Sequence, residues 1–226
     1  ASDVYKRQVY EEKKMEEMEV CFLMDRFGYM KLIDKNAYER NKEAVHNENK
    51  YVFNCMNTDK ICIFTDMGRM HSIKVADIPL VRFRDKGTPA DNLSNYDSSQ
   101  EQILYVAPAG QVKLSTLLFV TKTSMCKLVA GEEFDVAKRT IASTKLGEED
   151  QLIFVGPADE MEQIVFQSQN GYFLRILKTD VSTMKKTSVG VRGMKLGDGD
   201  VLEHAYLVEP RQEYTIQYHD LSLIHI

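Results

Sequence analysis

The feature that most constrains the fold of this chain is an apolar–turn–apolar pattern that occurs four times. Its clearest copy, IVFQSQNGYFLRILKTDV (residues 164–181), has two apolar runs around a polar turn that ends in Gly171. The other copies are centred on Gly28, Gly68 and Ser124, so neighbouring centres are 40, 56 and 47 residues apart. A glycine that closes a polar turn between apolar runs predicts a β-hairpin. Because serine is more strained than glycine at positive φ, we expect a different turn at Ser124.

The second halves of the repeats also align, since each ends in a further apolar strand. These strands are predicted at residues 51–53, 103–106, 152–155 and 205–208. A repeat of this length predicts a propeller-like array, and four short strands per unit suit a propeller-type blade. The predicted fold class is therefore all-β, with four blades and the start of a fifth. The expected blades span about residues 19–59, 60–109, 110–159 and 160–210.

The two ends of the chain, ASDVYKRQ and DLSLIHI, match no part of the repeat. We expect residues 1–18 to be a linker or a non-native tail, residues 19–213 to form the domain, and residues 214–226 to hold a truncated start of the next blade plus a non-native tail.

Composition limits the function further. The net charge is −5 and the isoelectric point is about 5.6, which argues against coating nucleic acid over the whole surface but allows a local basic stripe. The four cysteines lack C-x-x-C spacing and are expected to be buried, reduced thiols, and the five isolated histidines do not suggest zinc. We find neither an apolar run of the about 18 residues that a membrane span needs nor a signal peptide, so we expect a soluble, cytoplasmic protein.

Basic residues recur three or four places after each turn centre. Because a repeat places equivalent positions on one side of the array, we expect them to form a band around its rim. Such a band suits the phosphates of duplex DNA and reads no sequence. The alternative is that these cations serve solubility and edge protection. The predicted DNA-binding residues are Lys31, His71, Lys74, Arg84, Lys86, Lys127, Lys138, Arg139, Lys145, Arg175, Lys185, Lys186, Arg192 and Lys195.

The sequence carries no recognisable catalytic motif, such as a P-loop, G-x-S-x-G or H-E-x-x-H. Acidic clusters at residues 148–150 and 197–200 occupy matched positions before a predicted strand. Turn chemistry explains them better than a metal site. The turn Gly190–Gly193 is a candidate anion-binding nest formed by its backbone N–H groups and Arg192.

Two stretches carry a family resemblance. GYFLRI followed by GVRGMKLGDGDVL, and FTDMGRMHSIKVADIP, resemble the C-terminal domain of the A subunits of bacterial type IIA topoisomerases, that is, of DNA gyrase and topoisomerase IV. The resemblance covers about residues 19–210. It implies a β-pinwheel whose blades exchange strands and whose basic rim binds and bends duplex DNA. It carries a DNA-binding role onto Lys31, His71, Lys127, Arg175, Arg192 and Lys195.

The resemblance also implies properties of the parent enzyme. That enzyme would use ATP and Mg²⁺ elsewhere, and its ATPase B subunit would bind through the missing N-terminal part. The chain itself would hold no catalytic residue and no cofactor, and would be cytoplasmic and nucleoid-associated.

The chain departs from the family in one region. The gyrase proteins carry a basic, glycine-rich box in the first blade, whereas the matching residues 38–50, YERNKEAVHNENK, contain no glycine. This difference favours a topoisomerase IV-like role over gyrase-like wrapping. The alternative from another class is a propeller-type protein-interaction scaffold. The absence of Trp argues against its WD-repeat form.

Overall fold

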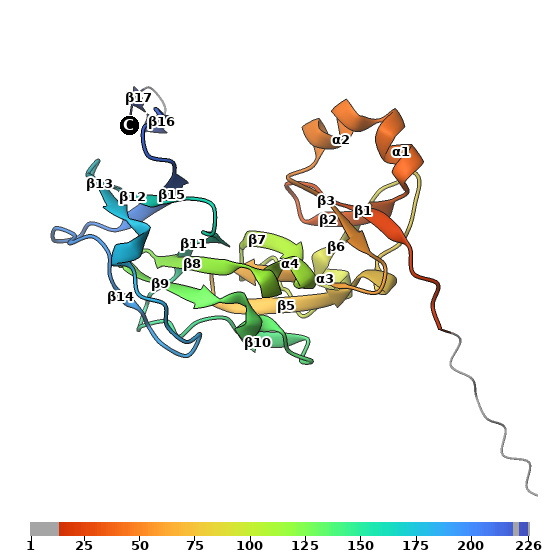
Figure 1. Ribbon diagram of the computed structural model, residues 1–226, viewed down its shortest axis with the longest axis horizontal. Helices are drawn as coiled ribbons and strands as arrows, with labels where there is room; N and C mark the ends of the chain where they lie inside the picture. The colour runs from red at the N-terminus through yellow and green to blue at the C-terminus, as the bar shows by residue number, and fades with distance from the viewer. Residues whose placement is uncertain (1–13, 219–221, 226) are drawn as a thin grey trace, which may run out of the picture.

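The computed structural model describes residues 14–218 and 222–225 (Figure 1). Four antiparallel sheets follow one another along the chain, and a two-stranded sheet comes last. The strands are β1 (Glu19–Met24), β2 (Tyr29–Ile33), β3 (Tyr51–Met56), β4 (Lys60–Thr65), β5 (Arg69–Lys74), β6 (Thr88–Pro89), β7 (Ile103–Pro108), β8 (Thr116–Thr121), β9 (Met125–Ala130), β10 (Thr140–Ala142), β11 (Leu152–Pro157), β12 (Gln163–Ser168), β13 (Phe173–Leu177), β14 (Val191–Arg192), β15 (Leu202–Val208), β16 (Thr215–Tyr218) and β17 (Ser222–His225). The α-helices are α1 (Lys35–Arg40), α2 (Lys42–Glu48), α3 (Ala90–Leu93) and α4 (Ala109–Leu114), and the 3₁₀ turns are η1 (Val75–Asp77), η2 (Gly131–Phe134) and η3 (Lys178–Asp180).

Neighbouring units exchange a strand. The sheet orders are β3-β1-β2-β6, β10-β5-β4-β7, β11-β8-β9-β14 and β13-β12-β15. The short strands β6, β10 and β14 each come from the unit that follows the sheet they complete. The all-β class and the strand-exchanged pinwheel are thereby confirmed.

The hairpin turns share one backbone conformation. Gly28, Gly68 and Gly171 have φ of 82°, 69° and 88°, as the repeat predicts. The expectation of a different turn at Ser124 is wrong, because its φ is 76°. The following unit holds this serine in place: the Ser124 hydroxyl accepts a 2.7 Å hydrogen bond from the Met194 amide, and its carbonyl accepts one from Gly193. These contacts offset the strain of a non-glycine residue in the left-handed region.

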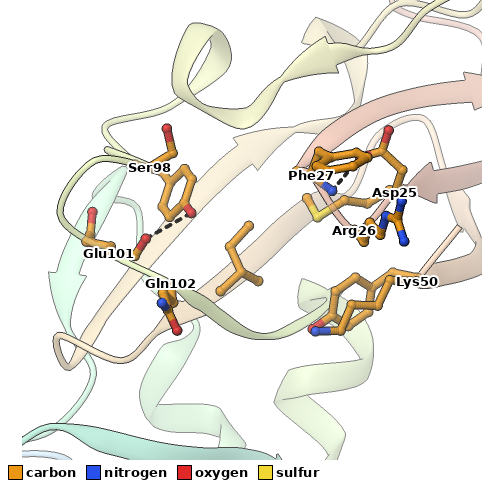
Figure 2. A pocket seen from close by; sticks show the side chains of 12 residues that line it. Asp25, Arg26, Phe27, Lys50, Ser98, Glu101 and Gln102 are labelled. Carbon is orange, nitrogen blue, oxygen red and sulfur yellow. Dashed lines mark hydrogen bonds between the residues drawn. The ribbon is translucent and has the colours of Figure 1, made fainter.

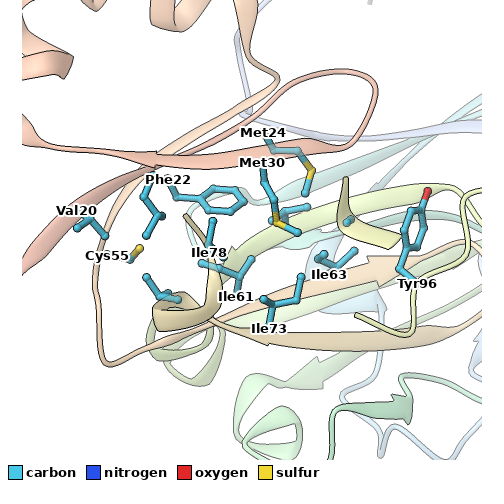
Figure 3. Packing of buried hydrophobic residues seen from close by; sticks show 14 residues of the cluster. Val20, Phe22, Met24, Met30, Cys55, Ile61, Ile63, Ile73, Ile78 and Tyr96 are labelled. Carbon is cyan, nitrogen blue, oxygen red and sulfur yellow. The ribbon is translucent and has the colours of Figure 1, made fainter. Parts of the chain in front are cut away.

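The hydrophobic core is divided among the seams between the sheets. The first cluster joins Phe22 and Met30 of the first sheet to Ile61 and Ile63 of the second (Figure 3). Two further clusters lie between the second and third sheets and between the third and fourth, around Phe119 and Phe166. Each sheet therefore contributes one face to each seam it borders, as the alternation of side chains along a strand requires.

Helices α1 and α2 cover the other face of the first sheet. Asp34 caps α1 by accepting a 2.7 Å hydrogen bond from the Ala37 amide. Ala37 and Val45 pack against Cys21, Leu23 and Ile33 in a fourth cluster. Figure 1 shows both helices beside β1 and β3. The sequence pattern predicted only the strand that follows these helices.

The four cysteines are free and buried, as predicted. Among the described residues, no helix is long and apolar enough to cross a bilayer. The proposed tail ASDVYKRQ lies outside the described residues. The last segment, by contrast, includes β17, which pairs with β16, the strand expected to start a fifth blade.

Candidate nucleic-acid interface

The structure separates the predicted DNA-binding residues into exposed and enclosed groups. Lys31 and Lys186 are half-buried, and His71 and Lys127 are buried. The exposed members are Lys74, Arg84, Lys86, Lys138, Arg139, Lys145, Arg175, Lys185, Arg192 and Lys195. A phosphate of duplex DNA can reach the exposed group without a rearrangement of the fold, whereas His71 and Lys127 are closed to it.

Lys127 lies inside the protein, so its placement on an exposed rim was wrong. It is 1% exposed, and its Nζ donates to the carbonyl oxygens of Lys185, Lys186 and Ser188 at 3.0, 3.1 and 2.6 Å. Burial lowers the pKa of Lys127 to about 8. Its ammonium group donates to three carbonyls of the loop that leads from η3 to β14, and so ties this loop to the third sheet.

Lys31 repeats this arrangement in the first sheet. Its Nζ donates to the carbonyl oxygens of Phe83 and Asp85, in the loop between η1 and β6. Burial lowers the pKa of Lys31, while the nearby acids Glu48, Asp85 and Asp25 act in the opposite direction. In both sheets the basic side chain therefore anchors the loop that delivers the exchanged strand.

His71 occupies the equivalent position in the second sheet and is also buried, at 1% exposure, which contradicts its predicted place on the rim. Its Nδ1 lies 2.9 Å from the Thr140 hydroxyl, on the exchanged strand β10. Its Nε2 lies 3.1 Å from both carboxylate oxygens of Glu101. Burial by itself would raise the pKa of Glu101, but hydrogen bonds from His71, Thr65 and the Asp97 amide outweigh it and leave the pKa below its usual value.

A recurring acid braces the hairpin turns. The acids are Glu101, Asp150 and Asp200. Each lies two residues before the outer-strand residue that pairs with the last residue of the first hairpin strand. Asp150 accepts from the amide and hydroxyl of Thr123, and Asp200 accepts from the Asn170 amide at 3.1 Å. These contacts give the acidic clusters their role in turn geometry.

The segment Gly190–Gly193 is not an anion-binding nest. Val191 and Arg192 form β14 and pair with Cys126 and Met125, and the Gly193 amide donates to Ser124. The Arg192 side chain is nevertheless exposed. Strand pairing therefore replaces the predicted nest, while the cation stays accessible.

Most of the exposed members lie on the exchanged segments or on the loops beside them, whereas Lys74 ends β5 and Arg175 lies on β13. The Ser143 amide donates to the carbonyl of the turn residue Gly68, and the Gly193 amide donates in the same way to Ser124 of the next sheet. Lys145 and Lys195 follow these two donors by two residues, so they occupy equivalent positions. Lys74 and Arg139 line one cleft together with Lys60, a cation absent from the predicted set. Lys60 could have been found from the sequence, because the hairpin register around the second turn places it opposite Lys74.

A groove also lies beside the first turn (Figure 2). Its volume is about 300 Å³, and Figure 2 shows Arg26, Phe27 and Lys50 on one side with Ser98 and Gln102 on the other. Phe27 is 70% exposed, and the Arg26 guanidinium lies 4.8 Å from the centre of its ring. This groove differs from the cationic loops because it presents an exposed aromatic ring.

Four sheets, three of them completed by a strand of the following unit and flanked by exposed basic loops, define a strand-exchanged, propeller-like array. The chain belongs to the family described as DNA gyrase C-terminal domain, beta-propeller. The model of that family matches residues 59–98, 115–159 and 162–209, which is more than half of the chain.

Relatives include much longer topoisomerase proteins. The A subunit of DNA gyrase from Lawsonia intracellularis is 26% identical over 208 residues, which cover 86% of this chain and 25% of that protein. The A subunit of DNA topoisomerase 4 from Streptococcus pneumoniae is 27% identical over 173 residues, which cover 74% of this chain and 21% of that protein. The chain spans at most about a quarter of these relatives.

Solved structures share the fold. The C-terminal domain of DNA topoisomerase IV superposes with a TM-score of 0.79 at 23% identity, over 87% of this chain and 63% of that one. The C-terminal domain of E. coli ParC gives a TM-score of 0.71 at 12% identity, over 92% of this chain and 86% of that one. At these identities the likeness concerns the fold alone.

Proposed function

We propose that this chain binds duplex DNA without sequence preference, as the C-terminal domain of the A subunit of a type IIA topoisomerase. The observation that carries the proposal is the recurrence of exposed cations on the exchanged segments, with Lys145 and Lys195 at equivalent positions of successive seams. Lysine and arginine at such positions neutralise backbone phosphates and release counterions. Membership of the family supports the same role.

The exposed cations would make the DNA contacts, because the enclosed cations Lys127 and His71 already hold the next unit in place. Within the whole enzyme, the domain would hold and bend DNA beside a cleavage core that uses ATP and Mg²⁺. The ATPase B subunit would bind through the remainder of the parent protein. A protein that binds DNA in this way would lie at the nucleoid, in the cytoplasm.

A topoisomerase IV-like role agrees better with the first unit than gyrase-like wrapping does. Residues 38–50 contain no glycine. They form most of α1 and α2, which pack onto the first sheet through Val45. A segment held in this way is poorly suited to act as a basic, glycine-rich wrapping loop.

Mobility shifts of a duplex at two salt concentrations test the proposal. The test variant carries Lys145→Glu, Arg175→Glu, Arg192→Glu and Lys195→Glu, four exposed positions. The control carries Lys14→Glu, Lys35→Glu, Arg40→Glu and Lys42→Glu, which lie before β1 and on the helical hairpin formed by α1 and α2. We expect salt-sensitive binding with a log–log slope of about −0.9 per phosphate neutralised, which the test variant loses and the control keeps.

Small circles relaxed by a separate topoisomerase test the second part. Unchanged linking number in the presence of the chain is expected for a topoisomerase IV-like domain. A change would establish gyrase-like wrapping. Absence of duplex binding by the folded chain at low salt would contradict the DNA-binding proposal itself.

A protein-interaction scaffold is the second candidate, and the groove beside Phe27 favours it. Aromatic residues, Phe among them, and arginine are enriched in the cores of protein–protein interfaces. If this surface supplies the function, Phe27→Ala abolishes partner binding, while the charge-reversal variants leave it intact.

A further inference from the structure

Two lysines stand directly opposite each other in the second hairpin. Lys60 begins β4 and pairs with Lys74, the last residue of β5. Side chains of directly opposed residues point to the same face of a sheet, with Cβ atoms about 4.5–5.5 Å apart. Like charges in this arrangement are destabilising. The hairpin therefore carries a local electrostatic penalty that an anion would relieve.

A third cation converges on the same place from the next unit. Arg139 precedes β10, and its carbonyl accepts a 2.8 Å hydrogen bond from the Ser72 amide. Lys60, Lys74 and Arg139 line a cleft of about 160 Å³ together with Ser72, Ala137 and Asp77. Pockets for drug-sized ligands begin at about 300 Å³, so this cleft has the scale of a small polar group.

The three cations of the cleft have little charge compensation from neighbouring carboxylates. Within the described part of the chain, none of the three cations forms an ion pair. Asp77 is the single carboxylate on the lining, and Asp59 accepts hydrogen bonds from the Lys60 and Gly110 amides. The Arg139 guanidinium donates to the Leu93 carbonyl, a neutral partner.

The repeat does not require this cluster. The equivalent cross-strand pairs in the third and fourth sheets are Thr116 with Ala130 and Gln163 with Leu177. The fold thus accepts neutral residues at these positions. Blade geometry therefore does not explain the two opposed lysines of the second sheet.

We propose that Lys60, Lys74 and Arg139 form an anion subsite that binds one phosphate group of the duplex backbone. The inference rests on the proposed DNA-binding function and places one contact at the seam between the second and third sheets. A phosphate here would neutralise the opposed lysines, and arginine can donate two parallel hydrogen bonds to it. Ser72, whose side chain hydrogen-bonds the Cys62 thiol, forms part of the wall of the cleft.

The test uses two probes on the full chain. Inorganic phosphate is titrated while the amide resonances of Ser72, Asp77 and Ala137 are followed by NMR. Duplex DNA binding is then measured over a range of salt concentrations. The test variant is Lys60→Gln with Lys74→Gln, and the charge-matched control is Lys35→Gln with Lys42→Gln on the helical hairpin. Because the test variant removes a repulsion, it should fold at least as well as the unmodified protein.

The expected result has two parts. Phosphate shifts the three resonances saturably in the unmodified protein and in the control but not in the test variant. For DNA, the log–log salt slope of the test variant is smaller in magnitude by about 0.9, the value for one phosphate, and that of the control is unchanged.

Other outcomes separate the two levels of the proposal. Equal salt slopes for the test variant and the control would overturn the subsite while DNA binding stands. A saturable phosphate shift without any duplex binding would overturn the proposed function and assign the cleft to free phosphate. If phosphate does not shift these resonances, the anion subsite is wrong.

Discussion

The basic residue that recurs after each turn has two structural options, to face solvent or to face the core. The equivalent residues Lys31, His71 and Lys127 take the second option. Lys31 and Lys127 hydrogen-bond loops of the next unit, and His71 contacts the exchanged strand β10. The residue opposite each basic residue on the neighbouring strand indicates which option is taken. Lys127 pairs with Phe119 and His71 pairs with Ile63, both fully buried residues, so each basic side chain shares the face of a core residue.

Replacing Lys127 with methionine tests this structural role. We expect Lys127→Met to lower the free energy of unfolding by about 2–3 kcal/mol, because three loop carbonyls lose the charged donor that this buried side chain supplies. Urea denaturation measures the change. Lys138→Met, at an exposed position, should stay within about 0.5 kcal/mol of the unmodified protein. A stable Lys127→Met variant with reduced DNA affinity would restore Lys127 to the DNA interface.

The buried carboxylate of Glu101 gives a pH-dependent prediction. Its pKa is lowered in the folded protein, so its contribution to stability is complete above the unfolded pKa of about 4.3 and is lost as pH falls through the folded pKa. Glu101→Gln should cost about 1.5–3 kcal/mol at about pH 7 and clearly less at about pH 3.5. Urea denaturation at both pH values measures this.

The exposed Glu148 provides the matched control for Glu101. Glu148→Gln should have a small effect that is the same at both pH values. An effect of Glu101→Gln that does not change between the two pH values would show that its charge contributes nothing to folding.

At the scale of elements, the hairpins and the outer strands could be predicted because each has its own apolar pattern. The exchanged strands could not. Val191–Arg192 is two residues long and becomes a strand only through its pairing with Cys126 and Met125. Helices α1 and α2 were missed for a related reason, since short, charged helices owe their stability to packing and not to propensity.

For the same reason the cationic band could be predicted only in part. The repeat identifies equivalent positions, whereas the sheet pleat and the path of the next unit decide which of them reach solvent. Arg175 and Lys195 are exposed, as expected, while His71 is enclosed.

The packing of α2 can be tested through Val45, which is fully buried against the first sheet. Val45→Asp should destabilise the protein by more than about 3 kcal/mol, because it places an unpaired charge in an apolar cluster. Asn47→Asp, on the exposed side of the same helix, should have little effect. Denaturant unfolding compares them. Equal stabilities would show that the helical hairpin does not contribute to the core.

At the scale of the whole molecule, the three seams give the array its coherence. Every seam combines an apolar cluster with an exchanged strand, so each unit depends directly on its neighbours. The stability of such an array is a sum over units and nearest-neighbour interfaces. Local damage should therefore spread from one seam to the next and weaken with distance.

The cysteines allow this to be measured seam by seam. Cys21 lies in the cluster under the helices, and Cys55, Cys62 and Cys126 lie in the first, second and third seams. Burial raises the pKa of Cys126 to about 11 and that of Cys62 to about 12, so these thiols react with alkylating reagents only after local opening.

Gly190→Ala should open the third seam selectively. Gly190 has a φ of 101°, and a Cβ there would lie 2.7 Å from the Cys126 carbonyl oxygen. The substitution should detach β14 from β9 and accelerate alkylation of Cys126 strongly, of Cys62 less, and of Cys21 least. Mass spectrometry after timed alkylation without denaturant gives the four rates. Gly197→Ala, where a Cβ would meet only open space, is the control. Equal acceleration at all four thiols would mean that the array opens as a single unit and that the seams carry no independent stability.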